Sequence, residues 1–191
     1  RIEEELYQKF SETKVIDLLK REELTVLNTI STAEGAIQIA MEESTKTLHG
    51  SKILVMGFGR VSKILSNMLK GIGAEVYCET RTTVNCAWIK AYGYKPILLD
   101  ELDNELGEFD IIINTIPHII LNEEKLKLLK RDCIIIDIAS NPGGVDRKAA
   151  KEIGIKLIWA LSLPGRVAPI TSAEFIKETL ENILKDIKNN S

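Results

Sequence analysis

Two glycines stand between a strand-like run and a helix-like segment in the first third of the chain. Gly57 and Gly59 follow the apolar run Ile53–Met56, and apolar residues at helical spacing begin with Val61. The first glycine permits a tight bend. The second lets the backbone approach a phosphate, which the free N–H groups of the helix start stabilise. This layout is typical of a dinucleotide-binding unit, so we expect a pyrophosphate at Gly57, Gly59, Arg60 and Val61.

The third glycine of the usual pattern is replaced by Ser62. Serine is small enough to keep the helix close to the strand, so the substitution is compatible with nucleotide binding. It makes the fingerprint less specific, and a plain βα turn without a ligand stays the alternative. The surrounding elements must therefore supply the rest of the site.

The end of the next predicted strand, 74–81, decides which dinucleotide fits. An NAD site carries an acid roughly 20 residues after the glycine turn. Thr80 lies close to that position in this chain, and Arg81 follows it. A hydroxyl and a guanidinium there would accept a 2′-phosphate, which favours NADP as the cofactor. Glu79 is the competing ribose acid and would give NAD. Strand alternation places Glu79 on the opposite face from Thr80.

Apolar strands and helices alternate around this turn. The predicted strands are 53–56, 74–81, 95–98, 109–117, 133–137 and 155–160. This alternation predicts an α/β fold with a doubly wound parallel sheet, the Rossmann order 3-2-1-4-5-6 and right-handed crossovers. The carboxyl ends of the strands then meet at one edge, where open α/β sheets bind ligands.

Three loops with polar or small residues follow strands at that edge. Thr115 and Pro117 end the fourth strand. The loop 138–146 contains two adjacent glycines, which let a planar ligand approach the backbone. The segment 161–169 contains two prolines and a glycine, so we expect a loop that lines the site rather than a helix or a central strand. Thr115, Pro117 and Ser140 are assigned to cofactor binding.

The chain is predicted to have four parts. In order they are 1–31, the remnant of an upstream domain; 32–50, a connecting helix or the face of a homodimer; 51–170, the NAD(P)-binding domain; and 171–191, a closing amphipathic helix. The chain opens on an arginine without a signal-peptide pattern, so we expect a piece of a longer protein.

Local patterns refine these parts. A helix is expected over 3–11, and short strands or helical turns over 15–19 and 25–29. Hydroxyl residues at 31–32 and 171–172 are expected to cap the connecting and the closing helix.

Composition excludes several classes of function. The chain has 45% hydrophobic and 28% charged residues and a net charge of −3, with both signs interspersed and no expected basic face, so nucleic acid is not an expected partner. No apolar run approaches the roughly 18 residues of a membrane span. The three cysteines show no metal-ligand spacing, which suits buried thiols in a reducing cytoplasm. Without a nucleophile elbow or a phosphate loop, hydride transfer is the favoured chemistry.

Five motifs, taken in order, resemble the A subunits of dipicolinate synthases from spore-forming bacteria. They are Thr32–Ala36 before His49–Ser51, Gly57–Arg60, Asn114–Pro117, Asp137–Asp146 and Leu161–Pro169. The resemblance extends from Val15 to Leu184, and the family's chain is longer at its amino end by a first domain. Two residues depart from the family pattern: Ser62 replaces a glycine, and Ile170 stands where a basic residue is expected.

The resemblance implies oxidation of dihydrodipicolinate, or its hydrated precursor, to dipicolinate during sporulation. It implies a nicotinamide cofactor, a small dicarboxylate substrate and, as the partner, a flavoprotein-like B subunit, in the cytoplasm of the mother cell. Aromatisation makes this reaction strongly downhill, so the protein mainly has to hold a dianion against the nicotinamide and accept a proton.

Residues suited to these tasks lie in the predicted loops and the connecting helix. The candidate carboxylate anchors are Thr32, Asn141, Gly143, Gly144, Gly165 and Arg166, the glycines through their N–H groups. Asp146 or Glu34 is the candidate base, or orients a water. His118 is a further candidate base, with an exposed loop histidine as the alternative interpretation.

Two other functions stay open. One is another NAD(P)-dependent dehydrogenase acting on 2-hydroxy or 2-amino acids. Such enzymes usually place a His or Lys acid/base beside the nicotinamide, and the histidines here are His49 and His118. The other is a dinucleotide-binding, non-catalytic subunit whose chemistry belongs to its partner.

Overall fold

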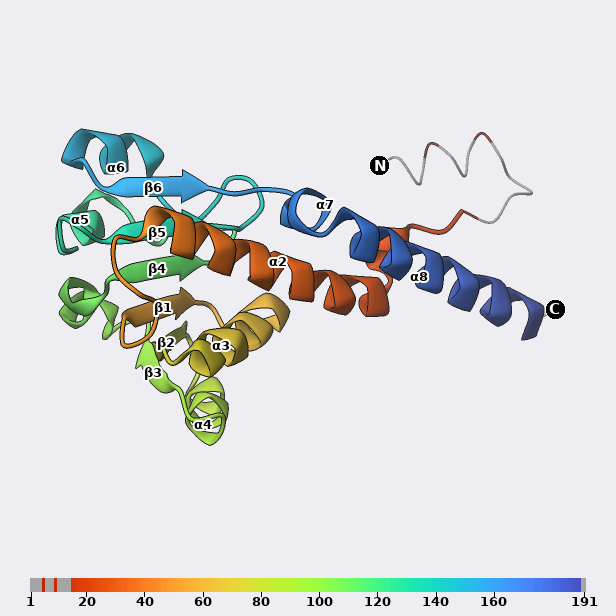
Figure 1. Cartoon of the computed structure of the whole chain (residues 1–191), viewed down its shortest axis with the longest axis horizontal. Coiled ribbons are helices and arrows are strands. Elements are labelled where there is room, and N and C mark those ends of the chain that lie inside the picture. Colours follow the sequence, from red (N-terminus) through yellow and green to blue (C-terminus); the bar gives the residue numbers. More distant parts are fainter. Residues whose placement is uncertain (1–4, 6–8, 10–14, 190–191) are drawn as a thin grey trace.

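A six-stranded parallel sheet forms the centre of the computed structural model, which describes residues 5, 9 and 15–189 (Figure 1). The strands lie in the order β3-β2-β1-β4-β5-β6, and every neighbouring pair is parallel. Their bounds are β1 Lys52–Met56, β2 Glu75–Thr80, β3 Lys95–Leu98, β4 Ile111–Asn114, β5 Ile134–Asp137 and β6 Lys156–Trp159. The predicted α/β fold and its strand order are confirmed.

Helices cover both faces of the sheet. They are η1 Leu18–Lys20, α2 Glu22–Glu43, α3 Arg60–Ile72, α4 Thr83–Ala91, η2 Leu102–Asn104, η3 Leu106–Glu108, α5 Glu123–Leu126, α6 Arg147–Ile153, α7 Leu163–Val167 and α8 Pro169–Asn189. Alternate residues of β1 enter different cores: Ile53 and Val55 pack with α2 and α3, whereas Leu54 and Met56 pack with α5 and α6.

Helix α2 begins at Glu22, so the expected cap at residues 31–32 is wrong. Of the two alternatives for 25–29 the helical one holds, as part of this longer helix. Of the two residues that suggested a cap, Thr32 donates its hydroxyl to the Asn28 carbonyl inside the helix instead, as Thr29 does to the Val26 carbonyl. The predicted domain border between residues 31 and 32 falls within this helix. Assignment of the earlier residues to an upstream domain stays a prediction, and the helix expected over 3–11 lies outside the described residues, apart from residues 5 and 9.

The loop expected over 161–169 is also wrong. The segment forms α7, and α8 then begins directly at Pro169 rather than after a cap at residues 171–172. Pro164 is the second residue of α7 and Pro169 the first of α8. Proline is tolerated in the first turn of a helix because its missing N–H would have no partner there.

Helix α2 lies beside α3 on one face of the sheet and extends past the carboxyl ends of the strands, where α7 and α8 pack on it (Figure 1). Buried alanines at positions 33, 36 and 40 allow its close approach to the strands. The first half of α2 therefore projects beyond the edge at which ligands bind in this fold.

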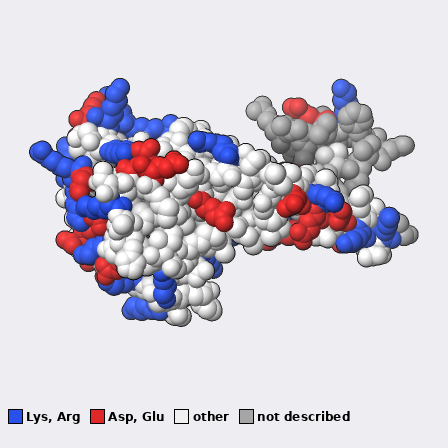
Figure 2. Space-filling view, viewed as in Figure 1, with Lys and Arg blue, Asp and Glu red and all other residues white. Residues whose placement is uncertain are grey.

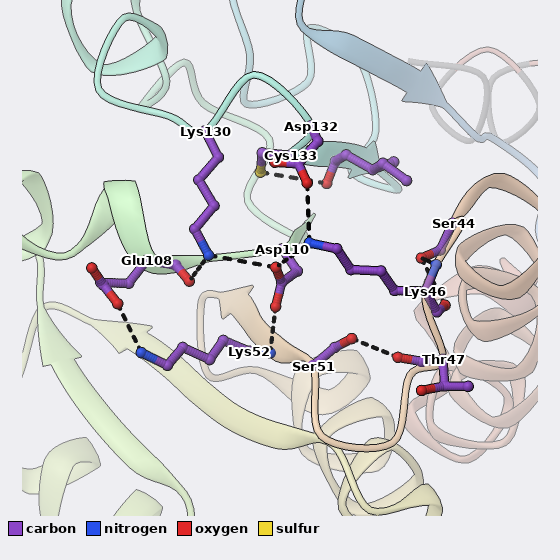
Figure 3. Close-up of polar contacts among 11 residues, drawn as sticks. Ser44, Lys46, Thr47, Ser51, Lys52, Glu108, Asp110, Lys130, Asp132 and Cys133 are labelled. Atoms are coloured by element: carbon purple, nitrogen blue, oxygen red, sulfur yellow. Dashed lines mark hydrogen bonds and ion pairs between the residues drawn. The ribbon is translucent and has the colours of Figure 1, made fainter.

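A cluster of ion pairs fixes the other end of α2 to the amino edge of the sheet (Figure 3). The Lys46 ammonium lies 3.2 Å from Asp110 Oδ1 and 3.0 Å from Asp132 Oδ2. Asp110 Oδ2 accepts the Lys52 N–H at 3.0 Å, and Lys130 lies 3.4 Å from Asp110 Oδ1. Partial burial acts to raise the pKa of Asp110, but these donors and charges together hold it below its usual range.

Replacing Asp110 with Asn should lower the free energy of unfolding at pH 7 by about 1–3 kcal/mol, because the Lys52 N–H and two ammonium groups lose a charged acceptor. A carboxyl with a lowered folded-state pKa contributes its stability only while it is ionised. The difference from wild type should therefore be constant above about pH 5 and shrink below about pH 4. Urea denaturation at several pH values measures both effects.

Asp132→Asn is the control for this substitution, because Asp132 pairs with the same lysine but its side chain is 63% exposed. Its effect should be much smaller, since exposed ion pairs are screened by water. Equal effects of the two substitutions would show that Asp110 does not anchor this cluster.

Candidate dinucleotide and substrate site

The glycine turn has the geometry of a phosphate cradle. Gly57 has a φ of +88°, and a Cβ there would lie 2.9 Å from Thr115 Oγ1 and from Ile116 Cγ1. Gly59 is the N-cap of α3, has no side chain to cap the helix, and would place a Cβ in open space with nothing within 4 Å. The first N–H groups of α3 thus have no side-chain acceptor at the cap, and room for an anion is left above Gly59.

Ser62 replaces the third glycine and links α3 to the end of β4. It is fully buried, and its hydroxyl lies 2.9 Å from that of Thr115. Thr115 in turn donates to the Met56 carbonyl at 2.8 Å. The departure from the glycine pattern therefore supplies a hydrogen bond across the turn that a glycine could not make.

A cavity of about 460 Å³, here called the Glu79 cavity, opens on one side of the turn. It is lined by Gly57, Phe58, Glu79, Thr80, Arg81, Thr82, Asn85, Ile116 and His118. Glu79 is fully buried, and its Oε2 accepts the Gly57 N–H at 3.0 Å. Its Oε1 is buried without a hydrogen-bond partner among the described residues. Burial raises the pKa of Glu79, although the Gly57 N–H and Arg81 act in the opposite direction.

Glu79 and Thr80 are successive residues of β2, so they lie on opposite faces of the strand, as expected. Both nevertheless line this cavity, which lies at the carboxyl end of the strand. The Thr80 hydroxyl is buried and accepts a hydrogen bond from the Asn85 side chain at 3.1 Å. Arg81 is exposed at the rim.

A second cavity of about 260 Å³, here called the Thr32 cavity, opens on the other side of the turn. It is lined by Thr25, Asn28, Thr29, Thr32, Gly59, Arg60, Val61 and Thr115. The spacing of its four α2 residues places them on one face of the helix. The sequence prediction missed Thr25, Asn28 and Thr29, because the helix was expected to start only after them.

Few side-chain hydrogen-bond donors remain available in the Thr32 cavity. Thr25, Thr29 and Thr32 each donate to a carbonyl of the preceding turn of α2. Arg60 forms a two-point ion pair with Glu22, with both N–O distances at 2.6 Å. Arg60 is exposed, so a carboxylate or phosphate in this cavity would compete with Glu22 for the guanidinium.

A buried hydrogen-bond network at the ends of β4 and β5 holds the loop 138–146. Asp137 accepts from the Asn114 amide at 2.7 Å, from the Ala139 N–H at 3.1 Å and from the Gly144 N–H at 2.8 Å. The Gly143 N–H donates to the Ser140 carbonyl. The predicted use of the Gly143 and Gly144 N–H groups as carboxylate anchors is therefore wrong, because both already have acceptors within the loop.

The remaining predicted site residues lie apart from the Thr32 cavity. Asp146 caps α6 by accepting the Ala149 N–H at 3.0 Å, and Glu34 is exposed on α2. His118 lines the Glu79 cavity, on the opposite side of the turn from Thr32. Five further predicted site residues are exposed and line neither cavity; they are Pro117, Ser140, Asn141, Gly165 and Arg166.

Other kinds of site find no support within the described part of the chain. No group of three or more His, Cys, Asp or Glu side chains there could hold a metal ion. Burial raises the pKa of the Cys78 and Cys133 thiols to about 12, which leaves both protonated at neutral pH. Among residues 5, 9 and 15–189, no helix combines the length and apolar character that a membrane crossing needs.

The chain belongs to the family described as "D-isomer specific 2-hydroxyacid dehydrogenase, NAD binding domain", whose sequence model matches residues 21–152. The match covers more than half of the chain and begins at Arg21, one residue before α2. The family takes a nicotinamide dinucleotide. The open space above Gly59 and the unpartnered Glu79 oxygen both fit such a ligand.

Comparison with individual proteins confirms the resemblance to dipicolinate synthase A subunits. The A subunit of dipicolinate synthase from Bacillus subtilis (strain 168) is 37% identical over 175 residues, which are 92% of this chain and 59% of that protein. A crystal structure of the A chain of dipicolinate synthase from Bacillus subtilis has a TM-score of 0.94 at 34% identity. That match covers 100% of this chain and 63% of the other.

A more distant relative is shikimate dehydrogenase (NADP(+)) of Pyrococcus abyssi (strain GE5 / Orsay). It is 30% identical over 172 residues, which are 80% of this chain and 64% of that protein. The chain thus spans less than two thirds of the length of each of these relatives.

Replacing Gly59 with Ala should weaken binding of NADP or NAD by at least about tenfold, because the new methyl group would occupy the space in which the pyrophosphate approaches the backbone. The free energy of unfolding should change by no more than about 1 kcal/mol, since the φ of Gly59 is accessible to alanine and the methyl group meets no atom. Fluorescence titration and thermal denaturation measure the two quantities.

Gly71→Ala is the matched control. Gly71 lies within α3 and also has nothing within 4 Å of a built Cβ, but it is far along the helix from the turn. Dinucleotide binding should be unchanged in this variant. Unchanged binding in Gly59→Ala as well would mean that the turn does not hold a pyrophosphate.

Proposed function

We propose that this chain is the dinucleotide-binding part of an oxidoreductase that converts dihydrodipicolinate, or its hydrated precursor, to dipicolinate with NADP during sporulation. The observation that carries the proposal is the open glycine turn between two cavities. It is supported by 37% identity to the A subunit of a dipicolinate synthase. The B subunit, the small dicarboxylate substrate and a location in the mother-cell cytoplasm are parts of the same proposal.

The choice of NADP rests on the Glu79 cavity. Arg81 stands exposed at its rim, where a guanidinium would pair with a 2′-phosphate. The relative from Pyrococcus abyssi carries NADP(+) in its name. NAD is the alternative, with Glu79 Oε1 accepting from a ribose hydroxyl.

In this proposal, residues on the two sides of the glycine turn have different roles. Gly57, Gly59 and the start of α3 would hold the pyrophosphate, with Glu79 and Arg81 on the adenosine side. When bound, the nicotinamide supplies the acceptor for a hydride. Arg60, together with Asn28 in the Thr32 cavity, would then orient the carboxylates of the substrate.

In this proposal, no residue of the Thr32 cavity accepts the proton that the substrate loses. None of the predicted bases Glu34, Asp146 and His118 lines it, and its lining contains no carboxylate or imidazole. We therefore propose that the proton passes to solvent or to a part of the longer enzyme that lies beyond these residues.

The same observation favours a second candidate, a dinucleotide-binding subunit that positions its partner without performing chemistry. A 2-hydroxy or 2-amino acid dehydrogenase is less favoured. His49 bonds to the Ile72 carbonyl near the amino end of the sheet, and His118 lies on the Arg81 side of the turn. Neither histidine is therefore in position to act as an acid or base in the Thr32 cavity.

Replacing Arg81 with Ala should weaken NADP binding by about tenfold to a hundredfold and leave NAD binding nearly unchanged, because a charged hydrogen-bond partner of the 2′-phosphate is removed. Titration of the variant with both dinucleotides gives the ratio. Lys90→Ala, an exposed cation on α4 that does not line the Glu79 cavity, is the control. An unaltered NADP to NAD ratio in Arg81→Ala would remove the case for NADP.

Reconstitution tests the reaction itself. When a purified B subunit is mixed with substrate, NADP and the full-length chain, the ultraviolet absorbance of dipicolinate should appear at a rate that requires both proteins. The Gly59→Ala variant should lower this rate. If the B subunit by itself gives the full rate, the non-catalytic candidate is supported instead.

A further inference from the structure

Helix α4 presents an apolar face to solvent. Val84, Trp88 and Tyr92 follow one another at intervals of four residues and are 67%, 54% and 45% exposed. Ala87 and Ala91 lie between them and are exposed as well. The opposite side of the helix is anchored by Ile89, which is fully buried. A helix of this kind has one face in the core and a second apolar face without a partner within the described chain.

The apolar face of α4 is continuous with the mouth of the Glu79 cavity. The rings of Trp88 and Tyr92 stack with centroids 5.9 Å apart and an interplanar angle of 26°. The Tyr92 ring lies 6.2 Å from that of Phe58, which follows Gly57 and lines the cavity. Three aromatic side chains thus lead from α4 to the glycine turn.

The surroundings of this face are basic. Residues 44–74 and 80–99 contain no Asp or Glu, so α3 and α4 carry only positive charges. The two acids of β2 add no free negative charge to this surface, because Glu75 pairs with Lys95 and Glu79 is buried. The positive side chains are Lys63, Lys70, Arg81 and Lys90, and Figure 2 shows Lys and Arg among uncharged residues at the end of the molecule formed by α4.

Two of these lysines lie directly against the aromatic rings. The Lys63 ammonium is 5.4 Å from the Phe58 ring, and Lys70 is 5.5 Å from the Tyr94 ring and donates to the Tyr92 carbonyl. One acid, Glu101, lines a further cavity beside α4 together with Ala87 and Lys90. The even mixing of charges expected from the composition therefore fails here, where an apolar centre has a basic rim.

We propose that the α4 face, defined as Val84, Ala87, Trp88, Ala91 and Tyr92, is the docking surface for the second subunit of the enzyme. The partner surface that fits it has an apolar centre and an acidic rim. This inference rests on the proposed function for the existence of that subunit. The relative from Bacillus subtilis carries a subunit designation in its name.

Charge decides between this partner and a second copy of the chain. A twofold dimer places the same patch on both sides, so it would set the four cations of one α4 face against those of the other. Exposed Trp and Tyr side chains at the centre of a patch are typical of the residues that dominate protein interfaces. Docking here would place the partner beside Phe58 and Arg81, at the entrance to the adenosine side of the site.

Titration of the full-length chain with purified B subunit tests the surface. Trp88→Glu should weaken the complex by at least about 30-fold, because it places a charge at the apolar centre, and Lys90→Glu should weaken it to a smaller extent. Raising the salt concentration should weaken the wild-type complex, since the rim charges are exposed. Leu128→Glu, an exposed leucine on the opposite face of the sheet, is the control and should bind normally.

NADP titration and thermal denaturation of each free variant separate this inference from the proposed function. Normal folding and NADP binding with a lost complex in Trp88→Glu support the docking surface, whether or not dipicolinate is formed. Wild-type affinity in both Trp88→Glu and Lys90→Glu overturns it and leaves the proposed reaction standing. Absence of a wild-type complex, with binding instead to phosphatidylserine vesicles or to single-stranded DNA, also overturns it.

Discussion

The buried pairing of Asn114 with Asp137 is the interaction on which the ligand-binding edge depends. These residues face each other in register at the ends of β4 and β5. A buried carboxylate is costly unless donors surround it, and here three donors do so. The same bonds bring Gly144 so close to Asn114 that a Cβ would lie 2.3 Å from its amide nitrogen. These bonds hold the loop after β5 in place at the ligand-binding edge. They also use the N–H groups of Ala139 and Gly144, which are therefore not free to bind a ligand.

The glycine turn then divides this edge into two chemically different halves. The Glu79 cavity offers a buried carboxyl and an exposed guanidinium. The Thr32 cavity offers hydroxyl, amide and guanidinium groups and no proton acceptor of the carboxylate or imidazole type. Its existence depends on α2 projecting past the strands, and the Lys46 cluster at the far end of that helix fixes its direction.

The exposed cations of α3 and α4 lie beside both the Glu79 cavity and the proposed docking surface. A dinucleotide carries several negative charges, and an acid-free face beside its cavity raises the local concentration of such a ligand. The same cations surround the aromatic side chains that join α4 to the turn. Arg81 and Phe58 belong to both regions, so occupation of the cavity and docking on α4 would affect each other through shared side chains.

The sequence by itself determined the α/β class, the strand order and the place of the glycine turn, because apolar periodicity and a glycine pair between strand and helix are local signals. It did not determine where α2 begins, since hydroxyls that bond inside a helix resemble a cap, nor that Pro164 and Pro169 stand in first turns. Only the tertiary structure decided that Glu79 and Thr80 share one cavity, that the Gly143 and Gly144 N–H groups are already used, and that the apolar residues Val84, Trp88 and Tyr92 of α4 are exposed. These features arise from contacts between distant segments, and no local pattern records which donors, acceptors and charges a neighbouring segment will meet.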